Sequence, residues 1–356
     1  MTTGVAQPDI HTVTDVDAVV TTSGGAPSAK RGHPFARYFG KRLLQGLFTV
    51  VCVSIVVFAA TQALPGNAAS VLRGTRSTPA EIKLVTVQLG LNHPLVVQYG
   101  HWLRDMFTSR LGGTSLSSGT SVSSIVVPRL VNSGILMAIV AVVSTLIAFT
   151  LGTVAALRRD SAIDAAIDTV ALALTSLPEF VVAIALVMLL CTNVFHLLPA
   201  VSVTTAGQIV WTHWLDLLLP ALTLTILCVP YIYRMVRATV SEALESDYAE
   251  MATLKGLRRR RVVLVHALPN ALPAIVQVVA LNLLYLASGV VIVETVFNYP
   301  GVGEGLVTAI NARDVPTIQT LVLLLATLYV VVNITADAVA LATSPRRRVL
   351  MASEAR

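Results

Sequence analysis

Six long apolar stretches, separated by polar segments, dominate the hydropathy pattern of this chain. They cover about residues 43–64, 133–157, 169–198, 217–233, 273–293 and 320–343. A helix rises about 1.5 Å per residue, so roughly 20 apolar residues cross the hydrocarbon core of a bilayer. The third stretch contains Pro178 and Glu179, and the fourth is short and interrupted by Pro220 and Pro230. The pattern predicts an all-α, polytopic membrane protein with six transmembrane helices.

The polar segments divide the rest of the chain. Residues 1–33 lack periodicity and are rich in Thr, Val, Gly, Ser and Asp, which is typical of a disordered tail. In the longest loop, residues 80–107 have helical patterning and residues 111–124 are rich in Gly and Ser. We expect a tail at 1–33, a segment leading into the first helix at 34–64, a loop subdomain at 65–132, a core of five helices at 133–343 with a long loop at 234–270, and a second tail at 344–356.

Composition supports a membrane protein and excludes a soluble one. Hydrophobic residues make up 55% of the chain and charged residues 12%, with a mean hydropathy of +0.76, whereas soluble proteins carry about 25% charged residues. The pI near 9.5 comes from Lys and Arg beside apolar stretches, so it reflects membrane topology and not nucleic-acid binding. Most of these cations lie in residues 30–42, 158–159, 234–261 and 346–356. These segments and both termini are therefore predicted to be cytoplasmic, and the 65–132 loop extracytoplasmic.

The sequence has no pattern typical of an enzyme. It lacks the G-x-x-x-x-G-K-[ST] phosphate loop and any specific nucleophile–base arrangement, so this chain is not expected to hydrolyse ATP itself. Its seven His residues show no metal-ligand spacing. Cys52, Cys191 and Cys228 lie in apolar stretches, where they resemble small core residues. We expect a chain that binds no metal or cofactor, and whose energy comes from a partner.

A short docking helix is predicted between the fourth and fifth apolar stretches. Asp247, followed three residues later by Glu250, forms an acidic variant of the capping box, which would place the first helical residue near Tyr248. Gly256 suits the left-handed position that ends a helix. The basic residues 258–261 would hold the segment at the cytoplasmic face. Such a rigid helix could pass the motion of a partner to the membrane spans.

This segment resembles the EAA signature of ABC importer permeases, which reads E-A-A, three residues, G, nine residues, I-x-L-P. The matching positions are Glu250, Ala252, Gly256, Leu268 and Pro269, and the departures are Met251 and His266. Ala249 and Ala252 also give the helix a face that another backbone can approach closely.

Most of the chain after the tail resembles the permeases of the dipeptide/oligopeptide/nickel importer family, and in particular the first of their two permease subunits. The stretches that carry this resemblance are Lys41–Leu44, Leu64–Gly66, Gly90–Tyr99 with Trp102, Leu111–Leu116, Ala155–Arg159, Val293–Gly303, Ala312–Asp314 and Pro345–Arg347. The 33-residue tail is an extension, and Glu179 stands where the family often has a small polar residue.

The resemblance implies a type I ABC importer permease fold and a transport subunit of the bacterial cytoplasmic (inner) membrane. Its implied function is ATP-driven import of di- or oligopeptides by alternating access. Implied partners are membrane lipid, a second homologous permease, ATPase subunits carrying ATP and Mg²⁺, and an extracytoplasmic substrate-binding protein. The implied ATPase-coupling residues are Tyr248, Ala249, Glu250, Ala252, Lys255, Gly256, Leu268 and Pro269. Nickel chelates or glutathione-like molecules are alternative substrates within the family, and an ion-coupled secondary transporter is an alternative outside it.

Three acidic residues in or beside the apolar stretches need an explanation. Glu179 lies within the third stretch, where a charge costs about 2.5–3.5 kcal/mol and so faces a bundle interior or water. It is a candidate pathway-lining residue for cationic or amino-terminal substrate groups, with an interhelical hydrogen bond as the alternative. Asp337 is expected to pair with a nearby Arg. Glu294 precedes the Pro300–Gly301 turn, where a structural role is expected.

Overall fold

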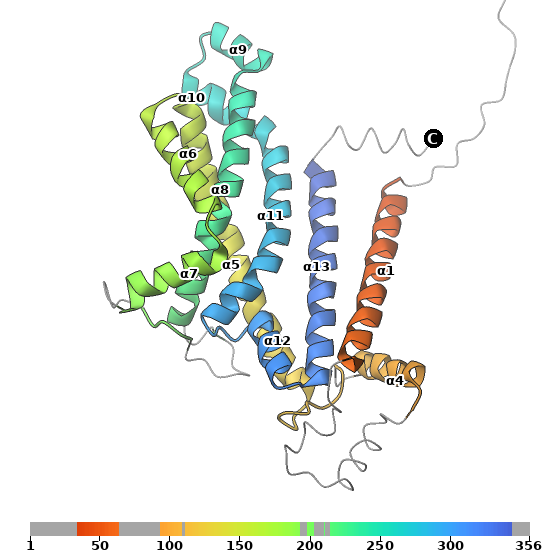
Figure 1. The fold of residues 1–356 in the computed structure, drawn as a ribbon. Helices are drawn as coiled ribbons and strands as arrows, with labels where there is room; N and C mark the ends of the chain where they lie inside the picture. Colours follow the sequence, from red (N-terminus) through yellow and green to blue (C-terminus); the bar gives the residue numbers. More distant parts are fainter. Residues whose placement is uncertain are drawn as a thin grey trace, which may run out of the picture.

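The computed structural model describes residues 34–63, 93–108, 111–192, 198–202, 210 and 214–343, which form helices joined by loops (Figure 1). The longer helices are α1 (Pro34–Gln62), α5 (Val122–Leu157), α8 (Leu215–Leu244), α11 (Leu268–Val296) and α13 (Val315–Thr343). The shorter ones are α4 (Leu95–Phe107), α6 (Ala162–Thr175), α7 (Glu179–Val187), α9 (Asp247–Leu254), α10 (Arg259–Arg261) and α12 (Val302–Asn311). Two π-helical segments, Met188–Thr192 and Val262–Ala267, follow α7 and α10. The described residues contain no β-strand, which agrees with the predicted all-α class.

Five helices are long and apolar enough to cross a membrane, and α6 with α7 makes a sixth if this bent pair counts as one span. The six predicted spans agree with this finding, but the third, predicted from about residue 169, begins at Ala162 and is broken. α6 ends at Thr175, α7 begins at Glu179, and the two are bent by 103°. Pro178, which precedes α7 in extended backbone, has no N–H to continue the helical ladder of α6, and this accounts for the break.

Two other predicted boundaries are also wrong. α8 continues through Pro220 and Pro230 to Leu244, so the beginning of the predicted 234–270 loop is helical. Both prolines are buried in the bundle, where packing outweighs the low helix propensity of proline. α5 begins at Val122, well before the predicted residue 133.

The bundle is built around α8, which packs against α5, α6 and α11. Gly152 lets α5 approach α8 closely, since a Cβ added there would lie 2.8 Å from the Val236 Cβ and 3.0 Å from the Tyr233 carbonyl oxygen. α13 packs on α11 and on α1. Where α1 meets α13, a Cβ on Gly46 would lie 2.5 Å from Val330. Small residues at helix crossings are typical of membrane bundles.

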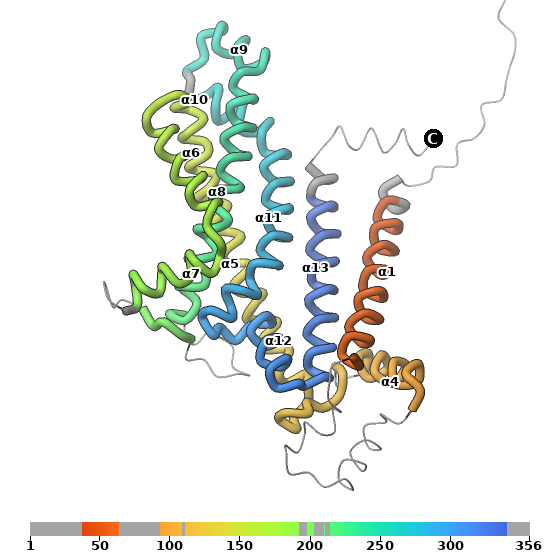
Figure 2. The backbone as a smooth tube through the Cα atoms, in the orientation of Figure 1, coloured from red at the N-terminus to blue at the C-terminus, as the bar shows by residue number. Residues whose placement is uncertain are grey.

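The connecting segments gather at two opposite ends of the bundle. α9 and α10 lie at one end, here called the α9 end, and α4 and α12 lie at the other, called the α12 end (Figure 2). α4 falls in the part of the 65–132 loop that was predicted to be helical, and its Trp102 and Met106 pack against Val57 and Phe58 of α1. Residues 64–92 and the predicted tails 1–33 and 344–356 lie outside the described residues.

Candidate functional site

The short helix α9 connects α8 to the π-helical segment before α11. Its N-cap is Ser246, with extended backbone (φ −75°, ψ 151°), and its first residue is Asp247. The predicted capping box is therefore wrong, because Asp247 lies inside the helix and no side chain caps it. The Ser246 hydroxyl instead donates a 2.6 Å hydrogen bond to the Ala243 carbonyl. Asp247 and Glu250 lie in the first turn, where carboxylates interact favourably with the helix dipole.

α9 ends, as predicted, at a left-handed glycine. Gly256 has φ +76°, and its N–H donates to the Thr253 carbonyl at 2.9 Å, while the Leu257 N–H donates to the Ala252 carbonyl at 3.3 Å. These two bonds form a Schellman motif. No atom lies within 4 Å of the position that a Cβ on Gly256 would take. The glycine is therefore required by the backbone conformation and not by lack of space.

The alanine face of α9 packs against the same chain. Ala249 and Ala252 are buried in a small cluster with Val262 and Leu257. Val262 begins the π-helical segment that continues directly into α11, whose first residues are Leu268 and Pro269. The residues between Gly256 and Leu268 thus turn the chain back from α9 into α11. This path gives a structural reason for the spacing of the motif and fixes α9 to the start of a long span.

The opposite face of α9 is exposed. Tyr248, Met251 and Leu254 follow one another at intervals of three residues, and are 41%, 59% and 75% exposed. We call these three residues the outer stripe of α9. Glu250 and Lys255 are exposed beside it. Exposed apolar side chains rimmed by polar ones mark surfaces for protein interaction. The motif comparison missed Met251 and Leu254, which the three-residue spacing of apolar side chains could have revealed.

Two ion pairs near the α9 end join α8 to α6 and to the α5–α6 turn. The buried Asp164 accepts two hydrogen bonds from Arg237, from Nε and Nη2, each at 2.7 Å. Arg159 pairs with Glu245, the residue that follows α8, and both are exposed. Bidentate Arg–carboxylate pairs are strong, whereas exposed pairs contribute little. Sequence analysis missed Asp164 and Arg237, because the two are 73 positions apart.

Glu179, the candidate pathway residue, is the first residue of α7 after the bend. Its Oε1 accepts a 2.8 Å hydrogen bond from the Tyr285 hydroxyl of α11, so the interhelical hydrogen bond named as the alternative is present. Its Oε2 is buried and has no partner among the described residues. A Cβ on Gly289 would lie 2.9 Å from Oε1, so this glycine makes room for the carboxylate.

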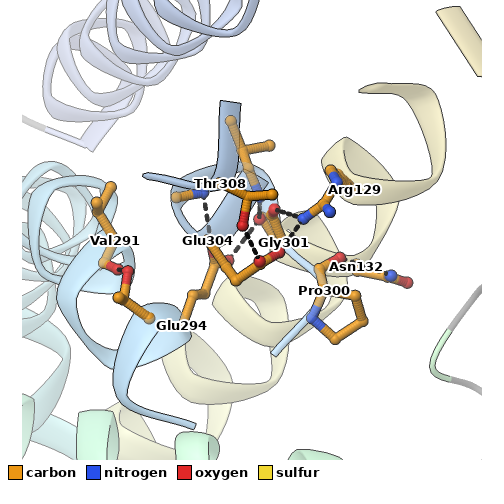
Figure 3. A network of polar contacts seen from close by, with 12 residues as sticks. Arg129, Asn132, Val291, Glu294, Pro300, Gly301, Glu304 and Thr308 are labelled. Carbon is orange, nitrogen blue, oxygen red and sulfur yellow. Dashed lines mark hydrogen bonds and ion pairs between the residues drawn. The ribbon is translucent and has the colours of Figure 1, made fainter. Parts of the chain in front are cut away.

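At the α12 end, a buried polar network joins α5, α11 and α12 (Figure 3). Glu294 is fully buried, and accepts hydrogen bonds from the Ser133 hydroxyl at 2.5 Å and from the Gly303 N–H at 2.7 Å. A Cβ on Gly301 would collide with the Glu294 carboxylate. The structural role expected for Glu294 is therefore supported by its contacts, which hold the Pro300–Gly301 turn against α11.

The same network extends to α5. Arg129 pairs with Glu304 and donates to the Gly301 carbonyl at 3.0 Å. The Asn132 side-chain amide donates to the Pro300 carbonyl at 2.9 Å, and the Tyr299 hydroxyl donates to the Asn132 carbonyl at 2.9 Å. Because these contacts are internal, we interpret the network as a rigid joint between three helices and not as a binding site.

Asp337, near the end of α13, pairs with a nearby arginine as predicted. The Arg42 Nε lies 3.1 Å from its Oδ2. This pair joins α13 to α1, whose long apolar surface otherwise has few buried residues.

This bundle of apolar helices, five or six of them long enough to span a membrane, defines a multi-pass membrane protein. Comparison with known families identifies its class further. The family described as binding-protein-dependent transport system inner membrane component matches residues 148–349, and a second model for the N-terminal part of the same kind of membrane component matches residues 35–121. The chain belongs to this family, and is an ABC importer permease of the inner membrane.

Individual relatives align with this chain over almost their whole length. A probable peptide ABC transporter permease protein of Sinorhizobium fredii is 32% identical over 311 residues, covering 87% of this chain and 99% of the relative. A putative peptide transport system permease protein of Brucella abortus is 33% identical over 313 residues, covering 86% and 98%. The glutathione transport system permease protein GsiC of Pectobacterium atrosepticum is 32% identical over 311 residues, covering 87% and 98%.

Proposed function

We propose that this chain is one of two permease subunits of an ATP-driven importer that moves di- or oligopeptides inward across the cytoplasmic membrane. The observation that carries the proposal is the construction of α9, a short helix with an exposed outer stripe that is fixed by a Schellman motif and a buried alanine face to the start of α11. A helix held in this way transmits force, whereas a helix on a mobile loop would absorb it.

In this proposal, ATPase subunits bind the outer stripe, with Glu250 and Lys255 at its rim. ATP and Mg²⁺ are bound by those subunits. Closure of the ATPase subunits moves α9, and the movement reaches α11 through the π-helical segment and α6 through the Asp164–Arg237 pair. The spans then alternate between outward- and inward-open arrangements, which is the rigid-body type of transition.

The sidedness follows from the basic residues. Residues 258–261 lie at the α9 end, which we therefore place in the cytoplasm with both termini. The α12 end then faces the extracytoplasmic substrate-binding protein. A carboxylate within the bilayer avoids lipid, so the face that carries Glu179 is proposed to face the second permease and the pathway between the two subunits.

Peptides are the proposed substrates because several relatives are named as peptide permeases. Glutathione, which is itself a small peptide, is the alternative suggested by a third relative. Nickel chelates are a further alternative, which rests on the resemblance of the sequence to the dipeptide/oligopeptide/nickel importer family.

The proposal is tested by purifying the tagged chain from its native membrane in mild detergent and identifying co-purifying proteins by mass spectrometry. Recovery of a second permease and of ATPase subunits is expected. A matched variant with charged residues in the outer stripe (Met251→Glu, Leu254→Glu) should lose the ATPase subunits and keep the second permease. Equal recovery of ATPase subunits by both would contradict the role of α9.

A further inference from the structure

The first residue of α7, at its bend with α6, has an unpartnered carboxylate oxygen. Glu179 is held by the Tyr285 hydroxyl through one carboxylate oxygen, while its other oxygen, Oε2, is buried without a partner among the described residues. No Lys, Arg or His pairs with this carboxylate within the part of the chain that the structure describes. The site therefore has a hydrogen-bond acceptor, and a potential negative charge, with no cation of its own.

A second unpartnered acceptor lies on the face of α11 that Glu179 contacts. Asn282 is only 2% exposed, and its Oδ1 is buried without a partner among the described residues. Asn282, Tyr285 and Gly289 follow one another at helical spacing, so they share one face of α11. Residues of α7 and α11 thus form this cluster, in which Glu179 contacts Tyr285 and lies against Gly289.

A cavity of about 340 Å³ opens beside this cluster. Its lining residues are Leu174, Thr175, Leu177, Leu227, Tyr231, Leu281 and Tyr285. Tyr285 belongs to both the cavity and the cluster, and Leu227 and Leu281 directly precede Cys228 and Asn282 in the sequence. The walls are apolar except for three hydroxyl groups. The cavity therefore suits an apolar side chain, and the Tyr285 in its wall contacts Glu179, which would accept a hydrogen bond from a donor group beside that side chain.

We propose that this cluster binds the protonated amino terminus of the transported peptide, and that the cavity takes the first side chain of that peptide. A primary ammonium has three N–H donors and no acceptor, which complements a carboxylate that has a free acceptor oxygen and no cation of its own. The site would hold a substrate partway across the membrane, since Glu179 follows the 14 residues of α6, or about 21 Å of helix. This inference rests on the proposed import function, because it requires the peptide to pass the α6–α7 bend.

The test places a thiol reporter in the cavity of the assembled importer, reconstituted in vesicles. Thr175, which is exposed and lines the cavity, is changed to Cys in a chain with Cys52→Ala, Cys191→Ala and Cys228→Ser. Labelling rates are measured with 2-aminoethyl methanethiosulfonate, which is cationic, and with methyl methanethiosulfonate, which is neutral. The ratio of the two rates reports the local attraction for an ammonium group.

Glu179→Gln, which keeps the size of the side chain, should lower this ratio by about tenfold or more, because a nearby charge in a poorly screened site is lost. The matched control Glu242→Gln removes an exposed charge near the end of α8 and should leave the ratio unchanged. Trialanine should protect the reporter from the neutral reagent, N-acetyl-trialanine should not, and Glu179→Gln should abolish the protection.

An unchanged ratio in Glu179→Gln, or equal protection by the acetylated peptide, would overturn the site. Tyr285→Phe provides a second variant, which should weaken protection by trialanine while the cationic preference is kept. Uptake driven by ATP is measured in the same vesicles. If uptake is present and the labelling predictions fail, only this binding site is wrong. If the parent importer shows no ATP-driven uptake, the proposed function itself is wrong.

Discussion

The conformation of Gly256 allows the role of α9 to be tested by a graded substitution series. The residue has φ +76° and open space where a Cβ would lie, so Asn, Ala and Val differ there only in how well they adopt a left-handed backbone. The left-handed conformation costs an ordinary L-residue about 1–2 kcal/mol, which changes the population of the native turn by about 5–30-fold. Asn tolerates this conformation best and Val, being β-branched, worst.

ATP-driven peptide uptake is expected to fall in the order wild type, Gly256→Asn, Gly256→Ala and then Gly256→Val, each normalised to the amount of chain in the membrane. Membrane insertion should be the same for all, because the turn lies outside the spans. ATPase subunits that co-purify with each variant provide the control for docking. Normal uptake by Gly256→Val would refute the reasoning that α9 must be held rigidly. Equal damage by Asn and Val would show that the backbone conformation is not the cause.

Three further predictions concern the packing of the bundle, each measured as the thermal stability of the detergent-solubilised complex. Gly152→Val should prevent the close approach of α5 to α8 and strongly lower stability. Its control is Gly134→Val on the same helix, which should be tolerated because the space around Gly134 is open. Equal effects of the two substitutions would contradict the close packing of α5 on α8. Asp164→Asn and Arg237→Ala should each lower the free energy of unfolding by about 2 kcal/mol, which is less than for a fully buried pair because the Arg237 side chain is 32% exposed. The double variant should be little less stable than either single variant. Additive losses of stability would show that the two residues do not interact. Glu294→Gln should lower the free energy of unfolding by about 1–3 kcal/mol, because an NH2 group would replace one of the two carboxylate oxygens that accept from the Ser133 hydroxyl and the Gly303 N–H. Unchanged stability would argue against the network.

Local sequence signals predicted those features whose cause is itself local. Apolar stretches predicted six spans, in agreement with five long helices and the bent α6–α7 pair, because a run of about 20 apolar residues suits little else. Gly256 predicted the end of α9, because few residues other than glycine adopt its backbone conformation. The pairing of Asp337 was also predictable, although its partner Arg42 was not, since that required knowledge that α1 lies beside α13.

Features that depend on packing could not be predicted in this way. Pro178 breaks a span whereas Pro220 and Pro230 do not, and only the burial of α8 in the bundle distinguishes them. The N-cap of α9 was predicted one residue too late, at Asp247 instead of Ser246. Ser and Asp are both favourable N-cap residues, so N-cap propensity does not distinguish these two neighbours. The Asp164–Arg237 pair joins distant positions and left no local signal.

The most direct test of the central claim is peptide uptake by the purified, reconstituted complex. The tagged chain is isolated with its co-purifying subunits, placed in vesicles, and supplied with a substrate-binding protein and radiolabelled trialanine. We predict uptake that requires ATP hydrolysis and the binding protein, and that is insensitive to dissipation of ion gradients. Uptake that needs no ATP and collapses with the ion gradient would contradict the account, and would show that the broken α6–α7 span belongs to a secondary transporter.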